Sequence, residues 1–152
     1  MEYTHDDQGL ARQPIGYWSW ATYEAVVPYI RAGLAEQGLT QPQWWVLNQL
    51  AEHPDGRDLK DLAAFLGGYL DVGEEGIEAE TRDLVSRGLA GSDENERIRI
   101  TDPGETLRKK AAEFQAGRMA TIHDGVSDEE YVAALKVLQR MIDNVGGRFW
   151  HH

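Results

Sequence analysis

The sequence predicts a mainly α-helical fold that carries one small β-hairpin. Apolar residues recur at steps of three and four in long segments throughout the chain, which is the period of a helix with one buried face. Two shorter runs, around Leu89 to Gly91 and Arg97 to Thr101, have the character of strands joined by a short turn. The chain shows no internal repeat, and we expect its 152 residues to form a single domain.

Composition narrows the possible functions. Hydrophobic residues make up 41% of the chain and charged residues 27%, which is typical of a soluble globular protein, and we expect a cytoplasmic location. The absence of cysteine excludes disulfides and thiolate chemistry. The net charge of −11 disfavours non-specific binding to DNA unless the 15 basic residues are clustered.

Helix-start signals divide the first part of the chain. A long helix is predicted from Pro14 to about Gly38, with apolar residues along one face. Thr40 then has the properties of an N-cap and Gln43 those of its capping-box partner, which predicts a helix from Pro42 to Glu52.

The segment from 58 to 102 predicts a winged helix-turn-helix. A helix over 58–67, a glycine-containing turn and a second helix over 73–87 precede the two strand-like runs. In this arrangement the second helix normally enters the major groove of DNA. Two further helices follow, one opened by Asp102-Pro103 and running to about His123, and one opened by a second capping box at Ser127 and ending near Gly146.

This order of elements resembles the MarR family of bacterial transcription regulators. The resemblance covers about residues 14 to 146. The motifs that carry it are LTQPQW at 39–44, DLAAFLG at 61–67, LVSRGLA at 84–90, RITDPGE at 99–105 and SDEE at 127–130.

The resemblance implies a homodimer that binds a pseudo-palindromic operator in double-stranded DNA. Its dimerisation helices would be residues 14–38 and 103–146, and its DNA-binding lobe residues 40–102. Ile77, Thr81 and Leu84 would be the buried positions of the recognition helix. The residues implied to contact DNA are Gly76, Glu78, Ala79, Arg82, Arg97 and Arg99.

The resemblance also implies a small aromatic or anionic effector, bound between the lobe and the dimer region. Tryptophan and tyrosine suit such a pocket because they stack on flat molecules and offer a hydrogen-bond donor. The candidate residues are Trp18, Trp20, Tyr23, Trp44 and Trp45. Aromatic residues at helical spacing are also typical of a dimer core, and for Trp18 and Trp44 we expect that role as well.

The predicted reading surface departs from the family pattern. Residues 71 to 87 hold six acids and two bases, the turn over 68–72 is about four residues longer than usual, and the wing tip over 93–96 is acidic. Carboxylates repel phosphates, and their one useful base contact is with the cytosine amino group. A second function therefore stays open, in which a MarR fold serves as a small-molecule-binding or protein-interaction module.

Catalytic and metal-binding motifs are lacking in the sequence. His53, His123 and the terminal pair His151-His152 do not combine with an acid at the spacing of a helical metal site. No Ser–His–Asp set or glycine-rich phosphate loop is present. We therefore expect no enzyme activity, no metal and no cofactor.

Overall fold

The computed structural model describes residues 2–68, 70–95 and 97–148, and within them it has seven helices and one three-stranded sheet. The mainly helical fold with a small wing is thereby confirmed. Among these residues no helix is both long and apolar enough to cross a membrane. In chain order the elements are α1 (Asp7–Leu10), α2 (Ile15–Glu36), α3 (Gln41–Glu52), β1 (Arg57–Asp58), α4 (Leu59–Gly67), α5 (Gly73–Ser86), β2 (Ala90–Ser92), β3 (Arg97–Ile100), α6 (Asp102–Ile122) and α7 (Asp128–Asn144).

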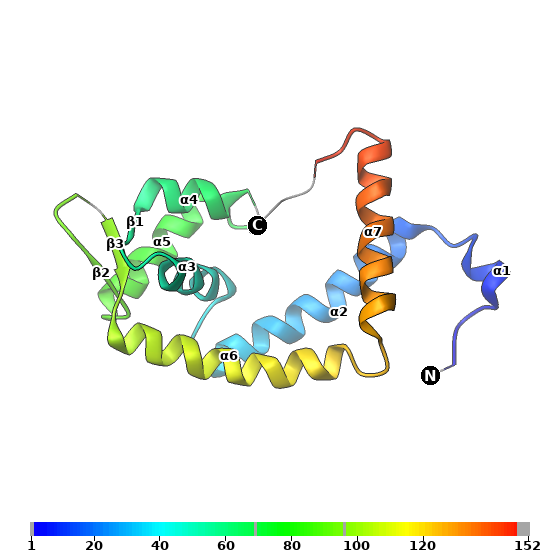
Figure 1. The fold of residues 1–152 in the computed structure, drawn as a ribbon, viewed down its shortest axis with the longest axis horizontal. Coiled ribbons are helices and arrows are strands. Elements are labelled where there is room, and N and C mark those ends of the chain that lie inside the picture. The colour runs from blue at the N-terminus through cyan, green and yellow to red at the C-terminus, as the bar shows by residue number, and fades with distance from the viewer. Residues whose placement is uncertain (1, 69, 96, 149–152) are drawn as a thin grey trace.

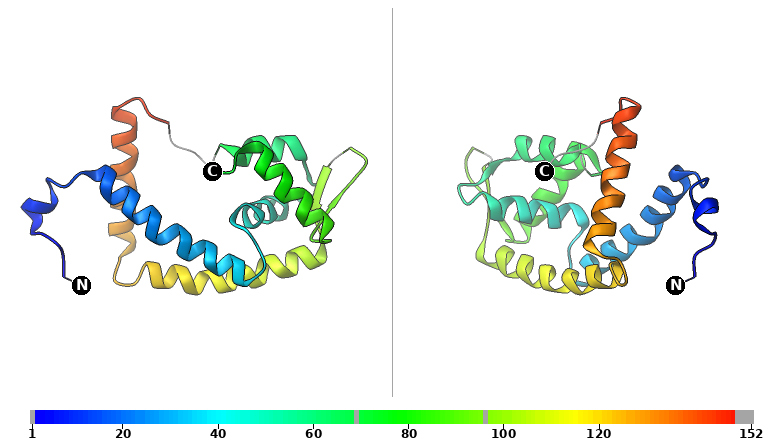
Figure 2. Two further views of the ribbon diagram at one scale, coloured as in Figure 1. Left: turned by 180° about the vertical axis from the view of Figure 1, so that it is seen from behind. Right: turned by 45° about the vertical axis from the view of Figure 1, so that its right-hand side comes forward.

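The elements form a lobe and an arm (Figure 1). Helices α3, α4 and α5 and the sheet make the lobe, while α2 and α6 pack side by side and lead away from it. Helix α7 leaves the far end of α6 at a steep angle, and it stands apart from the lobe in Figure 1 and in the left view of Figure 2. The predicted long helices therefore connect the lobe to a separate helical region.

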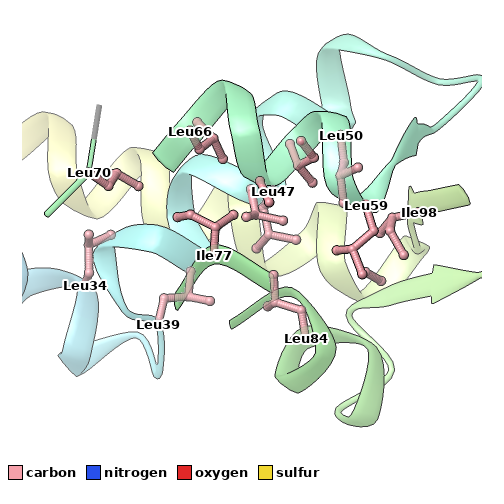
Figure 3. Packing of buried hydrophobic residues seen from close by; sticks show 14 of the residues in the cluster. Leu34, Leu39, Leu47, Leu50, Leu59, Leu66, Leu70, Ile77, Leu84 and Ile98 are labelled. Carbon is pink, nitrogen blue, oxygen red and sulfur yellow. The ribbon is translucent and has the colours of Figure 1, made fainter. Parts of the chain in front are cut away.

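The core of the lobe follows the predicted periodicity (Figure 3). Leu47 of α3 and Leu62 of α4 are fully buried, together with Ile77, Thr81 and Leu84 of α5. The three positions predicted to face inward on α5 are thus confirmed. Thr81 is tolerated there because its hydroxyl donates to the carbonyl of Ile77 at 2.7 Å.

Both predicted capping boxes form. The Thr40 hydroxyl accepts from the Gln43 backbone N–H at 3.2 Å, and the Gln43 side chain accepts from the Thr40 N–H at 3.1 Å. Ser127 and Glu130 repeat this pattern at the start of α7. The backbone N–H of Ser127 also lowers the pKa of Glu130, because it stabilises the carboxylate form.

The sheet has one more strand than the sequence predicted. β1 pairs with β3 in antiparallel register, with Arg57 opposite Ile98, so that β3 is the central strand. Gly56 makes the preceding turn with a φ of +81°, and a Cβ there would lie 2.7 Å from the Ile98 carbonyl oxygen. A two-residue strand is too short to produce an alternating pattern, which is why the sequence predicted only a hairpin.

Arg118 of α6 makes several contacts with α2. Arg118 donates to the Tyr29 carbonyl at 2.8 Å and to the Glu36 carboxylate at 2.6 Å, and its guanidinium lies 4.3 Å from the centre of the Tyr29 ring. A Cβ on Gly33 would overlap the Arg118 side chain, so glycine allows this close approach. The arm is therefore held by polar contacts as well as by apolar packing.

Candidate nucleic-acid interface and effector cleft

The outward face of α5 is the part of the lobe that the sequence predicts to read DNA. Ala79 and Arg82 are exposed on the side opposite the buried stripe of Ile77 and Leu84. Arg82 is 60% exposed and pairs with Glu78 at 2.8 Å one turn earlier. The outward face thus presents a bound ion pair and a small side chain, with one guanidinium available to a phosphate.

Gly76, also predicted to contact DNA, lies where α5 meets the turn that precedes it. It is half-buried, and a Cβ there would lie 2.7 Å from the Cβ of Val72. Glycine at this position therefore allows the turn before α5 to pack against the helix. A larger residue at position 76 would collide with Val72.

Two of the acidic residues of α5 are directed at α3. The buried amide of Gln43 donates to Glu80 at 2.7 Å and to Asp83 at 2.8 Å. Its oxygen accepts from Arg87 at 3.2 Å, and Arg87 also pairs with Asp83. These carboxylates fix α5 on α3, so part of the negative charge of α5 has a structural use.

The two wing arginines point back towards the turn before β1. Arg97 and Arg99, both exposed, donate from Nε to the Asp55 carbonyl at 2.7 and 3.2 Å. Arg99 also lies 3.6 Å from the Asp93 carboxylate. The backbone N–H of Arg97 lowers the pKa of Asp93. The wing therefore holds two guanidinium groups against the same backbone carbonyl, and that of Arg99 is also paired with Asp93.

The overall charge of the lobe is strongly negative. Residues 40–102 contain fourteen acids and six bases. The basic cluster at the start of α6 offers little compensation, because Arg108 binds Glu105 at 2.7 and 2.8 Å and Lys109 approaches the same carboxylate at 3.4 Å. The Arg108 guanidinium lowers the pKa of Glu105 to about 2. Any DNA contact made by this lobe depends on a few separate arginines.

An apolar cleft of about 510 Å³ lies between α2, α3 and α6. Trp44 and Trp45 line it from α3, Ile30 from α2, and Gln115 and Met119 from α6. Gln115 is buried and donates to the Ile30 carbonyl at 2.9 Å. Its Oε1 has no donor among the described residues, which leaves a buried acceptor in the wall of an apolar cleft.

The structure separates the five aromatic residues predicted to bind an effector. Trp44 and Trp45 line the cleft, and Tyr23 lines a neighbouring cavity of about 250 Å³. Trp18 and Trp20 line neither of these. They lie earlier on α2, where the centre of the Tyr17 ring is 5.3 Å from that of Trp18 and 6.1 Å from that of Trp20. Trp20 is 58% exposed. Both lie on the uncovered surface of α2, and their role in effector binding stays a prediction.

A polar group that sequence reasoning missed lies beside the cleft. Arg31 of α2 donates to the Asp71 carboxylate at 2.8 Å and to the Gln41 side chain at 2.8 Å. The hydroxyl of Tyr23 donates to the same Asp71 oxygen at 3.3 Å. Asp71 belongs to the long turn between α4 and α5, so this group ties that turn to the arm. The only sequence signal was the unusual length of the turn.

The similarity of this chain to known proteins lies in its three-dimensional structure. No family model and no curated protein matches the sequence. A MarR family transcriptional regulator from Silicibacter pomeroyi superimposes with a TM-score of 0.72 at 22% identity, over 93% of this chain and 99% of that one. The chain has the MarR fold.

Two other MarR-fold structures were captured with ligands. A MarR family protein from Mycobacterium tuberculosis, in complex with DNA, matches with a TM-score of 0.63 at 21% identity, over 89% of this chain and 99% of that one. CouR from Rhodococcus jostii, bound to p-coumaroyl-CoA, matches with a TM-score of 0.68 at 20% identity, over 92% and 96% of the two chains.

The arm of this MarR fold carries a broad uncovered apolar surface. None of the described residues of α7 is buried, although Tyr131, Leu135 and Met141 are 40 to 44% exposed and lie on an amphipathic helix. Ile15, Tyr17, Trp18 and Trp20 expose a second apolar area at the start of α2. Soluble monomers rarely leave so much apolar surface in contact with water.

Proposed function

We propose that this protein is a homodimeric transcription regulator that binds a pseudo-palindromic DNA operator and responds to a small ligand. The observation that carries the proposal is a winged helix-turn-helix lobe joined by α2 and α6 to an amphipathic helix, α7, whose apolar face is uncovered. Two copies of such a lobe, held at a fixed spacing, match two half-sites one helical turn apart. The DNA complex of the similar protein from M. tuberculosis supports this function.

A second copy of the chain is the proposed partner of α7. An isolated helix of 17 residues is marginal in water, and α7 finds little support within its own chain. A two-fold dimer would cover the same surface on both chains and bury the aromatic start of α2 beside it. Trp18 and Trp20 would then serve the dimer core rather than an effector pocket.

The cleft between α2, α3 and α6 is the proposed effector site. Trp44 and Trp45 offer flat apolar walls, and the unpaired Oε1 of Gln115 offers an acceptor to a hydroxyl or N–H of a ligand. A ligand wedged there would alter the angle between lobe and arm, and with it the spacing of the two recognition helices. The p-coumaroyl-CoA complex of CouR supports an aromatic effector.

A second function is favoured by one observation, the excess of acids in the lobe. With fourteen acids and six bases in residues 40–102, the lobe could serve as a binding module for a small molecule or a basic protein. The two functions differ in their response to salt. Binding of DNA through phosphates weakens steeply as salt rises, because each contact releases a counterion.

A mobility-shift assay with the promoter region of the protein's own gene separates the two functions. We expect the DNA to be retained at low salt. In a plot of the logarithm of the binding constant against the logarithm of the salt concentration, Arg82→Ala or Arg97→Ala should reduce the magnitude of the slope by about 2, because a dimer loses two phosphate contacts at once. Arg140→Ala, on the side of α7 away from Leu135, is the matched control. Absence of retention at low salt would favour the binding-module function.

A further inference from the structure

We infer that Arg31 is the receptor for the carboxylate of an aromatic acid, and that Asp71 occupies this receptor in the free protein. This inference rests on the proposed effector site and deepens it. Asp71 places one carboxylate oxygen between two donors, Nη2 of Arg31 and the hydroxyl of Tyr23. A ligand carboxylate would find the same two donors, and Asp71 holds their place within the chain.

The position of Arg31 connects it to the apolar cleft. A cavity of about 250 Å³, lined by Tyr23, Arg31 and Asp71, adjoins the cleft of about 510 Å³, because Val27 and Gln41 line both. Gln41 also accepts a hydrogen bond from Nε of Arg31, which holds the guanidinium in the smaller cavity beside a residue that lines both spaces. A molecule with its ring against Trp44 and Trp45 would therefore direct an anionic group towards Arg31.

The pair of Arg31 and Asp71 is built to be exchanged. Its side chains are 42 and 53% exposed, and an ion pair so accessible to water contributes little net stability. An aromatic acid brings the same charge and adds the burial of its ring. When a ligand carboxylate replaces the carboxylate of Asp71, Arg31 keeps a negatively charged partner. The exchange therefore leaves no unpaired charge on Arg31.

Release of Asp71 would act on the recognition helix. Asp71 lies between Leu70, which belongs to the lobe core, and Val72, the N-cap of α5. Among the described residues no side chain caps the N-terminus of α5. The hydrogen bonds that Asp71 accepts from Arg31 and Tyr23 are therefore side-chain contacts close to the first turn of α5. The two bonds from α2 therefore hold the start of α5 against the arm, and their loss would free it.

Binding of 2-naphthoate and its primary amide, measured by calorimetry, tests the receptor. We expect the acid to bind more tightly than the amide, and Asp71→Asn to tighten the acid two- to fivefold by removing the competing carboxylate. Arg31→Gln should abolish the preference for the acid. Glu75→Gln, which removes another exposed carboxylate close by on α5, is the matched control and should change neither value.

Hydrogen exchange tests, without any ligand, whether the bonds from Arg31 and Tyr23 to Asp71 hold the start of α5. Asp71→Asn should accelerate exchange of the amides of residues 70–77, whereas Glu75→Gln should not. Equal exchange in Asp71→Asn and the parent protein, or an acid preference that survives Arg31→Gln, would overturn the inference. If the acid binds and Trp45→Ala abolishes binding while Asp71→Asn has no effect, the effector cleft stands and the receptor role fails. Absence of binding by both compounds in all variants would count against both.

Discussion

Removal of one side chain from α7 measures the proposed dimer interface. Leu135 is 40% exposed, and complete burial of a leucine contributes about 2 kcal/mol. Covering the exposed two-fifths would contribute about 0.8 kcal/mol, and a two-fold dimer contains the contact twice. Leu135→Ala should therefore weaken dimerisation by about 1.6 kcal/mol, or about 15-fold in Kd.

Sedimentation equilibrium over a range of concentrations gives this Kd directly. Alanine favours helix, so a weaker dimer would not reflect loss of helix propensity in α7. Arg140→Ala changes the opposite side of α7 and should leave the Kd within a factor of two. A monomeric parent protein, or an unchanged Kd for Leu135→Ala, would refute the assignment of this surface to a second copy.

The remaining predictions concern α6. Gly104→Ala should destabilise the fold by about 2 kcal/mol in urea denaturation, because the added Cβ would overlap the Leu89 carbonyl oxygen. Gly117→Ala should instead stabilise the fold by up to about 1 kcal/mol, because the space around Gly117 in the same helix is open. Glu105→Gln should remove about 1 kcal/mol at neutral pH. Because Arg108 lowers the pKa of Glu105 from 4.5 to about 2, this contribution is complete above pH 4.5 and disappears as the pH falls through about 2. Parallel stability curves for Glu105→Gln and the parent protein between pH 5 and 2 would contradict it.

Local signals carried most of the prediction of the fold. The capping boxes at Thr40 and Ser127 and the buried stripe of α5 depend on residues within a turn or two of one another, so their sequence spacing determines them. β1 was missed because its two residues become a strand only through pairing with β3, about forty residues later.

The site was predicted less completely, because its contacts join distant segments. Gln43 was recognised as a capping residue, but its bonds to Glu80 and Asp83 depend on how α5 crosses α3. The bond from Arg31 to Asp71 likewise spans forty residues. The number of acids on α5 predicts a single acidic surface, whereas in the fold some of these acids lie on the outward face and others contact α3. The DNA contacts of Gly76, Glu78, Ala79, Arg82, Arg97 and Arg99 stay predictions.

The exposure of α7 has a consequence for how the protein responds to its own abundance. Because α7 has no buried residue within its own chain, it would gain folding free energy from the proposed dimerisation, and folding would then be linked to assembly through mass action. The melting temperature would then rise with protein concentration. In a cell that makes few copies, the protein would be scarce and also less well folded, so the concentration of the proposed dimer would rise more steeply with protein abundance.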